Sequence, residues 1–306
     1  MAISRSQMMK ELLPGLNALF GLEYDKYEDE HKAIYETESS DRAFEEEVKL
    51  AGFGAAPVKS EGSAISYDTA QEHFTARYNH ETIAMGFSIT EEAVEDNLYD
   101  SVSARYTKAL ARSMAHTKQV KGAYPLNNAY TAGNFTAGEG VALCATTHAL
   151  VTGGTVANAL STASDLNETS LEQAVIDIAA FTEDRGLLIA ARPRKLICAP
   201  YNQFVATRIL ETELRVGTAD NDINALRTNG TIPEGYSVNH FLTTTNKKFW
   251  FLMTDVPNGM KHFQRTALQT GMDGDFDTGN VRYKARERYS FGVSDYLGIF
   301  GSGSIT

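Results

Sequence analysis

The sequence predicts an α+β fold on three observations. Residues 88 to about 124 repeat apolar side chains at steps of three and four, which is the pattern of one helix face. Residues 74–87 and 281–293 instead alternate apolar and polar side chains, which is typical of strands. Shorter helical and strand patterns alternate between residues 168 and 275. The long helix is therefore the expected spine of the molecule.

Residues 88–124 carry signals for both ends of this spine helix. Ser88 and Glu91 have the spacing of a capping box, and further acidic residues follow in the first turns, where the helix dipole favours them. Gly122 and Pro125 predict its end. Such a helix would be about 50 Å long at about 1.5 Å per residue. An exposed coiled-coil strand is the alternative, but small and polar residues favour packing against a sheet: Ser101, Ser103, Ala104 and Ala111.

Composition limits the class of protein. The 306 residues suffice for two modest domains or one elaborated one, and 42% hydrophobic content supports a core. A formal net charge of −11 argues against a surface that binds nucleic acid or anionic membrane throughout. No apolar run approaches the roughly 18 residues needed to cross a bilayer, so no membrane partner is expected. Cys144 and Cys198 are far apart and predict free thiols in a reducing cytoplasm.

The N-terminal third predicts a helix, an acidic arm and a protruding hairpin. Residues 1–20 have helical periodicity, whereas residues 23–47 are strongly acidic but contain enough aromatic side chains to fold onto a surface, which a second copy could supply. Residues 48–70 are rich in Gly, Ala and Ser and are expected to be mobile. Phe74, Ala76 and Tyr78 predict one strand, and residues 83–87 its hairpin partner. A two-stranded hairpin needs a partner surface.

Catalytic and metal-binding patterns are weak, and we expect no catalytic residues, no metal and no cofactor. Cys144 and His148 could form half a zinc site or a thiol–base pair, but no further ligands lie close in sequence, so a structural histidine is favoured. Residues 273–277 resemble the start of a calcium loop, yet Thr278 and Lys284 occupy positions that require Gly and Glu.

The last predicted strand carries a regular charge pattern. Arg282, Lys284, Arg286 and Arg288 project to one side of it, with mainly apolar residues on the other. An ordinary solvated face, a phosphate contact and a salt-bridge seam all fit this pattern. In so anionic a protein, pairing with an acidic protein surface is favoured over phosphate contact.

The order of these segments resembles the tailed-phage major capsid protein with the Hong Kong-97 fold, and more closely its Mu-type major head subunit family. The resemblance covers nearly the whole chain, although each motif is loose. The residues that carry it are Gly86-Phe87-Ser88-Ile89-Thr90, Glu95-Asp96-Asn97-Leu98, Leu143-Cys144-Ala145-Thr146-Thr147-His148, Lys195-Leu196-Ile197-Cys198-Ala199-Pro200, Arg288-Tyr289-Ser290-Phe291-Gly292-Val293 and Gly298.

The resemblance implies a phage capsid fold with four regions. These are an N-arm over residues 1–46, an extended E-loop over 47–87, a P-domain over 88–167 and 276–306 with the spine helix, and an A-domain over 168–275. Intersubunit contacts are then expected at Lys59, Glu61, Phe74, Tyr78 and the four basic residues Arg282, Lys284, Arg286 and Arg288. A loop with Thr218, Asp220 and Asp222 would face the capsomer axis. Some family members link a Lys to an Asn covalently, but Lys59 alone does not predict that bond.

The implied function is that of a major capsid protein in the virion, assembled in the host cytoplasm. Pentamers and hexamers of the chain would form an icosahedral shell around double-stranded DNA. The shell would make only weak, non-specific contacts with this DNA. Scaffold, portal and decoration proteins would be further partners, and a start at Met1 favours a separate scaffold. Two alternatives remain at this stage: an encapsulin-type compartment, and a soluble metal-dependent hydrolase built on Cys144, His148 and the Asp273 cluster.

Overall fold

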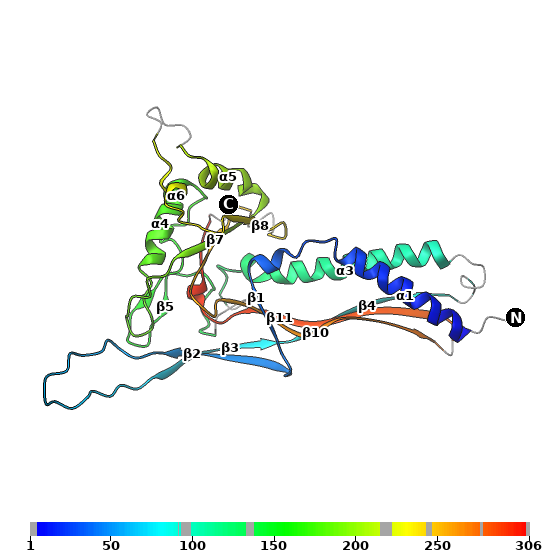
Figure 1. Ribbon diagram of the computed structural model, residues 1–306, viewed down its shortest axis with the longest axis horizontal. Helices are drawn as coiled ribbons and strands as arrows, with labels where there is room; N and C mark the ends of the chain where they lie inside the picture. The colour runs from blue at the N-terminus through cyan, green and yellow to red at the C-terminus, as the bar shows by residue number, and fades with distance from the viewer. Residues whose placement is uncertain are drawn as a thin grey trace.

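A long helical layer lies over one sheet, and a second α/β unit stands at one end of it, as Figure 1 shows. The computed structural model describes residues 5–90, 92, 99–132, 138–214, 222–242, 247–275 and 278–303, with backbone alone for 5–12 and 99–102. None of the helices in these ranges is long and apolar enough to cross a membrane.

The first sheet, which we call the body sheet, has the order β1-β10-β11-β4. Its strand β1 is parallel to β10, and the other neighbours are antiparallel. The strands are β1 (Glu36–Ser39), β4 (Glu81–Ile89), β10 (Met260–Gly274) and β11 (Val281–Val293). Helices α1 (Arg5–Tyr24) and α3 (Tyr99–Asn127) lie over one face of it.

The α1 helix and the acidic arm fold onto their own chain. Leu16 and Phe20 of α1 pack with Leu110 and Met114 of α3 and with Tyr283 of β11 in one buried cluster. The arm continues as the short 3-10 helix η1 (Glu30–Ala33) and then as β1. The N-terminal helix and the sheet-packed spine are therefore confirmed, and the arm finds its surface within the same molecule.

Both ends of the spine helix differ from the prediction. Ser88 is a residue of β4 and pairs with Arg282 in the ladder, so it does not cap the helix. Residue 91 and residues 93–98 lie outside the described chain. At the other end α3 passes through Gly122 and Pro125 to Asn127. Gly122 is instead a point of close approach, because a Cβ there would lie 2.9 Å from the Cβ of His31.

The predicted hairpin of residues 74–87 is wrong. Strand β3 (Gln71–Asn79) pairs with β2 (Phe44–Ala51), whereas β4 pairs with β11. His80 lies at the crossing between the two sheets, where its ring bonds Ser40 and Ser290 at 2.9 and 3.0 Å. The protruding element is therefore formed by residues 44–79, which we call the ribbon; residues 52–70 are its connecting segment.

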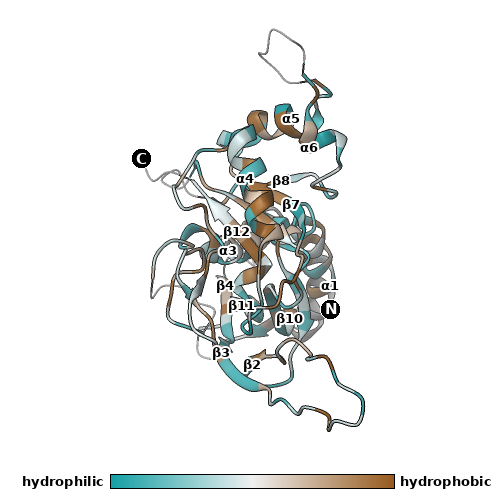
Figure 2. Cartoon of the chain, turned by 90° about the vertical axis from the view of Figure 1, so that its left-hand side faces the viewer, coloured by the Kyte–Doolittle hydropathy of each residue, from teal (hydrophilic) through white to brown (hydrophobic). Residues whose placement is uncertain are grey.

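The second unit contains a sheet of order β12-β9-β7-β8. Figure 2 shows hydrophobic residues concentrated on α4 and the strands beside it, and Trp250 is fully buried there. Asn167 caps α4 and forms a capping box with Ser170. The bounds are α4 Glu168–Ala179, β7 Pro193–Cys198, η2 Pro200–Asn202, α5 Gln203–Glu211, α6 Ala225–Thr228, β8 Tyr236–Val238, β9 Trp250–Thr254, η3 Tyr296–Gly298 and β12 Ile299–Ser302, with the short pair β5 His148–Ala149 and β6 Thr155–Val156.

Two histidines are buried where η1 meets the spine helix and the body sheet. The ring of His262 stacks on Phe291 with centroids 4.5 Å apart, and His31 meets His262 edge-on at 5.4 Å. The backbone N–H of His31 donates to the Gln119 side chain of α3 at 3.2 Å. Burial lowers the pKa of His31 to about 4 and that of His262 to about 3, so both are neutral near pH 7.

Acid is expected to weaken the folded chain through these histidines. The unfolded chain takes up a proton near the ordinary pKa of 6.5, whereas His31 resists protonation down to about 4. The free energy of unfolding should therefore fall as the pH drops from 6.5 to about 4, by up to about 1.4 kcal/mol per pH unit for each histidine. Urea unfolding of wild type and His262→Gln across this range measures it.

The stability advantage of wild type over His262→Gln should shrink as the pH falls. The exposed His116 of α3 provides the control, because its side chain is in contact with solvent. An equal pH dependence for wild type, His262→Gln and His116→Gln would contradict this account.

Candidate functional site at the root of the ribbon

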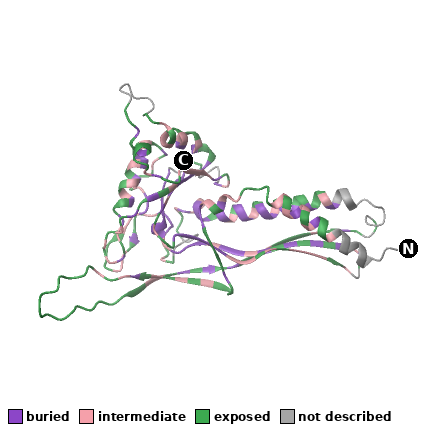
Figure 3. Ribbon diagram, viewed as in Figure 1, coloured by how far each residue is buried: buried purple, intermediate pink, exposed green. Residues whose placement is uncertain are grey.

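The ribbon exposes an unusual amount of apolar surface. Every residue of the connecting segment from Ala55 to Ala70 is exposed, and Figure 3 shows this part in green. Within the ribbon, the apolar side chains with the largest exposed fractions are Val58 (98%), Tyr67 (93%), Ile65 (67%), Leu50 (64%) and Phe53 (59%). Exposed apolar clusters of this kind mark surfaces that another molecule covers.

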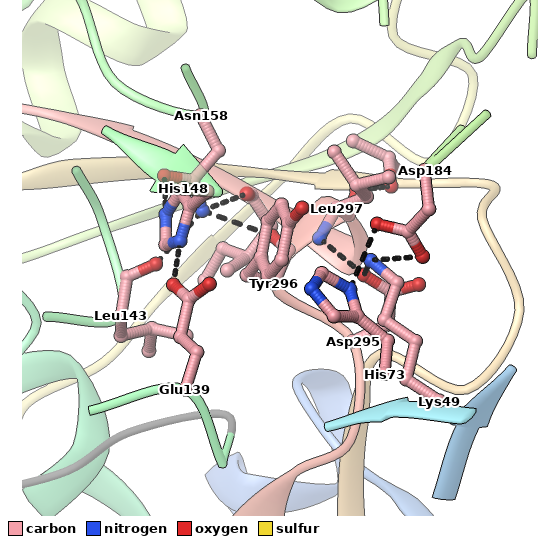
Figure 4. Close-up of polar contacts among 12 residues, drawn as sticks. Lys49, His73, Glu139, Leu143, His148, Asn158, Asp184, Asp295, Tyr296 and Leu297 are labelled. Atoms are coloured by element: carbon pink, nitrogen blue, oxygen red, sulfur yellow. Dashed lines mark hydrogen bonds and ion pairs between the residues drawn. The ribbon is translucent and has the colours of Figure 1, made fainter. Parts of the chain in front are cut away.

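The root of the ribbon, by contrast, is fixed to the body by a buried carboxylate (Figure 4). Asp184 is only 3% exposed and receives one side chain from each strand. The Nδ1 atom of His73 on β3 lies 3.2 Å from its Oδ1, and Nζ of Lys49 on β2 lies 3.9 Å from its Oδ2. Lys49 also lies 3.1 Å from Oδ1 of Asp295. Charges this deeply buried require such pairing.

A stacked aromatic pair supports this carboxylate site from behind. Tyr296 lies 4.0 Å below Nζ of Lys49, and His148 stacks on its other side with centroids 3.9 Å apart and an angle of 4°. The Nδ2 of Asn158 donates to three backbone carbonyls, which fixes Oδ1 as the acceptor for Nε2–H of His148 at 2.9 Å. Nδ1 of His148 contacts Glu139. His148 is thus structural, as favoured from the sequence.

A second anchor joins β2 to the body sheet. Lys261 of β10 is 4% exposed and pairs with Glu47 of β2 and, at 3.0 Å, with Glu38 of β1. Tyr78 of β3 is 3% exposed and its ring lies on Gly292, where a Cβ would come within 2.1 Å of it. Tyr78 therefore holds the ribbon to its own chain, and the expected intersubunit contact at Tyr78 is corrected.

The alternation of the basic row (Arg282, Lys284, Arg286 and Arg288) is confirmed. The first three are exposed and Arg288 is half-buried, on the face of the body sheet opposite α1 and α3. Arg282 pairs with Asp275 at 2.6 Å, whereas Lys284 and Arg286 form no ion pair with any described residue.

The remaining predicted residues are spread over the surface. Lys59 and Glu61 are exposed in the connecting segment, and Phe74 is half-buried against the ring of His73 at 3.6 Å. Asp222 is exposed, while Thr218 and Asp220 lie outside the described residues. Sequence reasoning missed Lys49, His73 and Asp184. The available signal was the spacing of Glu45, Glu47 and Lys49 at every second position, which puts all three on one face of a strand.

The arrangement does not support hydrolytic chemistry. Burial raises the pKa of the Cys144 thiol, so no thiolate is available there, and His148 is bonded to Glu139 and Asn158. Within the described ranges, no three His, Cys, Asp or Glu side chains converge as metal ligands. What the site does is set the direction of the ribbon relative to the body.

Replacing Asp184 with Asn should loosen the ribbon root. Lys49 and His73 would keep their burial but lose the shared carboxylate, at a cost of about 3 kcal/mol in the free energy of unfolding. The matched control is Asp68→Asn, which breaks an exposed pair with Arg185 and should change stability little. Denaturant unfolding of the unassembled chain measures both, and equal effects would contradict the anchoring role of Asp184.

Solved structures of shell proteins share this fold. The capsid of an empty GTA particle aligns with a TM-score of 0.58 at 13% identity, covering 92% of this chain and 91% of that chain. The capsid of the Myoviridae phage XM1 aligns at 0.55 with 10% identity and 89% of each chain. A virus-like particle from Pyrococcus furiosus aligns at 0.54 with 10% identity, covering 94% and 98%. Curated protein sequences gave no match.

A family model described as phage capsid protein matches residues 74–301, about three quarters of the chain. That range includes most of β3, the spine helix, strands β4, β10 and β11 of the body sheet and nearly all of the second unit, but not β1. The function is accordingly structural, that of a major capsid protein in an icosahedral virion shell. The chain belongs to the phage capsid protein family.

Proposed function

We propose that the chain is the head subunit of a tailed phage of the Mu type, arranged as pentamers and hexamers around double-stranded DNA. The observation that carries this proposal is the contrast within the ribbon, whose root is buried in ion pairs while its connecting segment exposes apolar side chains throughout. A fixed root and an uncovered tip suit an element that reaches onto a neighbouring subunit.

The energetics favour such a contact. Complete burial of one large apolar side chain contributes about 1.5–3 kcal/mol, and the connecting segment offers several. One contact of this size is modest, but each subunit of a closed shell both gives and receives it, so the contacts act together. The single chain has no other way of covering Val58, Ile65 and Tyr67 in this conformation, because the segment extends away from the body.

The proposed division into regions follows the strand pairing. Residues up to about 43 form the N-arm, and the ribbon from Phe44 to Asn79 forms the E-loop. Because β4 and β10 both pair with β11, we assign them to the P-domain with the spine helix. The A-domain is then residues 168–259, and its loop with Thr218, Asp220 and Asp222 is proposed to face the capsomer axis.

The basic row is proposed to meet an acidic surface of a neighbouring subunit. Thr82, Ala84, Gly86 and Ser88 of β4 lie opposite its members in the ladder, and these small residues leave the long cations uncovered. The net charge of −11 means that most surface of another copy is acidic. Packaged DNA would then receive only weak, non-specific contacts, and scaffold, portal and decoration proteins remain further proposed partners.

An encapsulin-type compartment is not favoured. The family model that matches residues 74–301 is that of a phage capsid protein. Nuclease-protected DNA in purified heads, rather than an enclosed enzyme, is the result that the phage proposal requires.

Shortening the ribbon should abolish shells without unfolding the chain. Gly54 N–H donates to Asp68 at 2.8 Å, so the ends of residues 55–67 are already close and Asn-Gly can replace that stretch. Because all the removed residues are exposed, the melting temperature should not change. Negative-stain microscopy measures whether shells form. A second variant, in which a Gly–Ser chain of equal length replaces residues 55–67, distinguishes the contribution of the side chains from that of the length of the segment. Uniform closed shells from both variants would overturn the role of the ribbon.

Reversing the charge of the basic row should block assembly more than it lowers stability. Lys284→Glu with Arg286→Glu removes two exposed cations that have no ion pair with a described residue, so the isolated chain should melt as wild type does. Arg192→Glu with Arg208→Glu, at two exposed positions of the second unit, is the matched control for net charge. Particle yield by sedimentation measures the effect, and an unchanged yield for the double variant would overturn the salt-bridge seam.

A further inference from the structure

Strand β4 ends the body sheet with an open edge. It pairs with β11 over nine successive residues without a register shift, and no described strand pairs with its other side. Alternate N–H and C=O groups of β4 therefore point away from the sheet with no ladder partner. From Thr82 to Ile89 the strand has no charged residue and no proline.

Several of the other described edge strands are protected. The edge strands β1, β8 and β12 have only three or four residues, and β1 carries two glutamates. Strand β2 carries four charged residues, and its pairing with β3 is broken by a register shift. Short strands, charges and bulges are the devices that keep an edge from pairing with another chain. Strand β4 is long and regular, and apart from Glu81 at its start it has none of these protecting features.

We propose that β4 is completed by a strand from a second copy of this chain, namely residues Ser63–Tyr67 of the neighbour's connecting segment. This inference rests on the proposed reach of the ribbon and names its receptor. The segment is exposed, lies outside any strand and alternates apolar Ile65 and Tyr67 with Ala64 and Ser66. Strand addition would satisfy backbone groups on both partners.

The two faces of β4 match those of the incoming segment. On the helix side, Met85 is 51% exposed, while Ile83 and Phe87 pack beneath α3, so Ile65 and Tyr67 would extend this apolar surface. On the other face, Ala84 and Gly86 lie between the basic row and the open edge. An added strand would lie about 10 Å from β11, within reach of a lysine or arginine side chain passing over such small residues. Glu61 precedes the segment and provides a carboxylate there.

Cysteine pairs test the contact in assembled particles. Chains with Met85→Cys and chains with Tyr67→Cys are mixed, assembled and oxidised; the native Cys144 and Cys198 are buried and do not interfere. Disulfide-linked dimers are expected in the mixture and not in either chain alone, and not when Tyr67→Cys is mixed with Ala179→Cys on exposed α4. Dimers from Met85→Cys alone would mean that two β4 edges pair with each other, which overturns the proposal.

A charge placed on the edge provides a second test. Ala84→Lys at the exposed face should reduce particle yield at least about tenfold with an unchanged melting temperature, whereas Ala179→Lys should assemble as wild type does. Closed particles of the mixed Met85→Cys and Tyr67→Cys chains that give no cross-link, together with normal assembly of Ala84→Lys, would overturn the strand addition alone. A wild-type chain that forms no closed particle would instead overturn the function proposed above.

Discussion

The structure depends on one buried carboxylate, Asp184, which receives Lys49 and His73 from the two strands of the ribbon. Without it and the second anchor at Lys261 and Tyr78, a two-stranded ribbon would be a marginal element that samples many directions. With it, the direction of a long and largely uncovered element is set by the body of the same molecule. A shell protein needs that constraint, because a contact made at the tip closes a shell only when its angle is defined.

The body is correspondingly self-sufficient on the side of the spine. Leu16 and Phe20 of the α1 helix cover the spine helix and the sheet, so this core is completed within one chain. On the opposite face of the sheet, Lys284 and Arg286 form no ion pair with a described residue, and no described strand pairs with the open edge of β4. In the proposed arrangement, folding and assembly use different surfaces, which lets a subunit fold before it is incorporated.

Local sequence patterns predicted a helix or strand correctly where the pattern directly reflects which side chains are buried. The spine periodicity and the alternation in β11 follow from which side chains face the sheet. The hairpin failed because two alternating runs joined by a short turn have the same local signature whether they pair with each other or with distant strands. The strand pairing was decided by long-range contacts. His80, for example, is buried between Ser40 and Ser290, and both partners are remote in sequence. The prediction that Ser88 caps the spine helix was also wrong, because the spacing of a capping box can occur at the end of a strand as well.

The sequence alone predicted the spine helix and the charged row, because each depends on residue type and short-range spacing, and the class of protein followed from the resemblance in the order of its segments. Tertiary structure decided which strands pair, which arm stays on its own chain and which charges become buried. Those outcomes depend on contacts such as Lys49 with Asp184, between residues more than a hundred positions apart. No local periodicity encodes them, because burial of a charge is favourable only once the distant partner is in place.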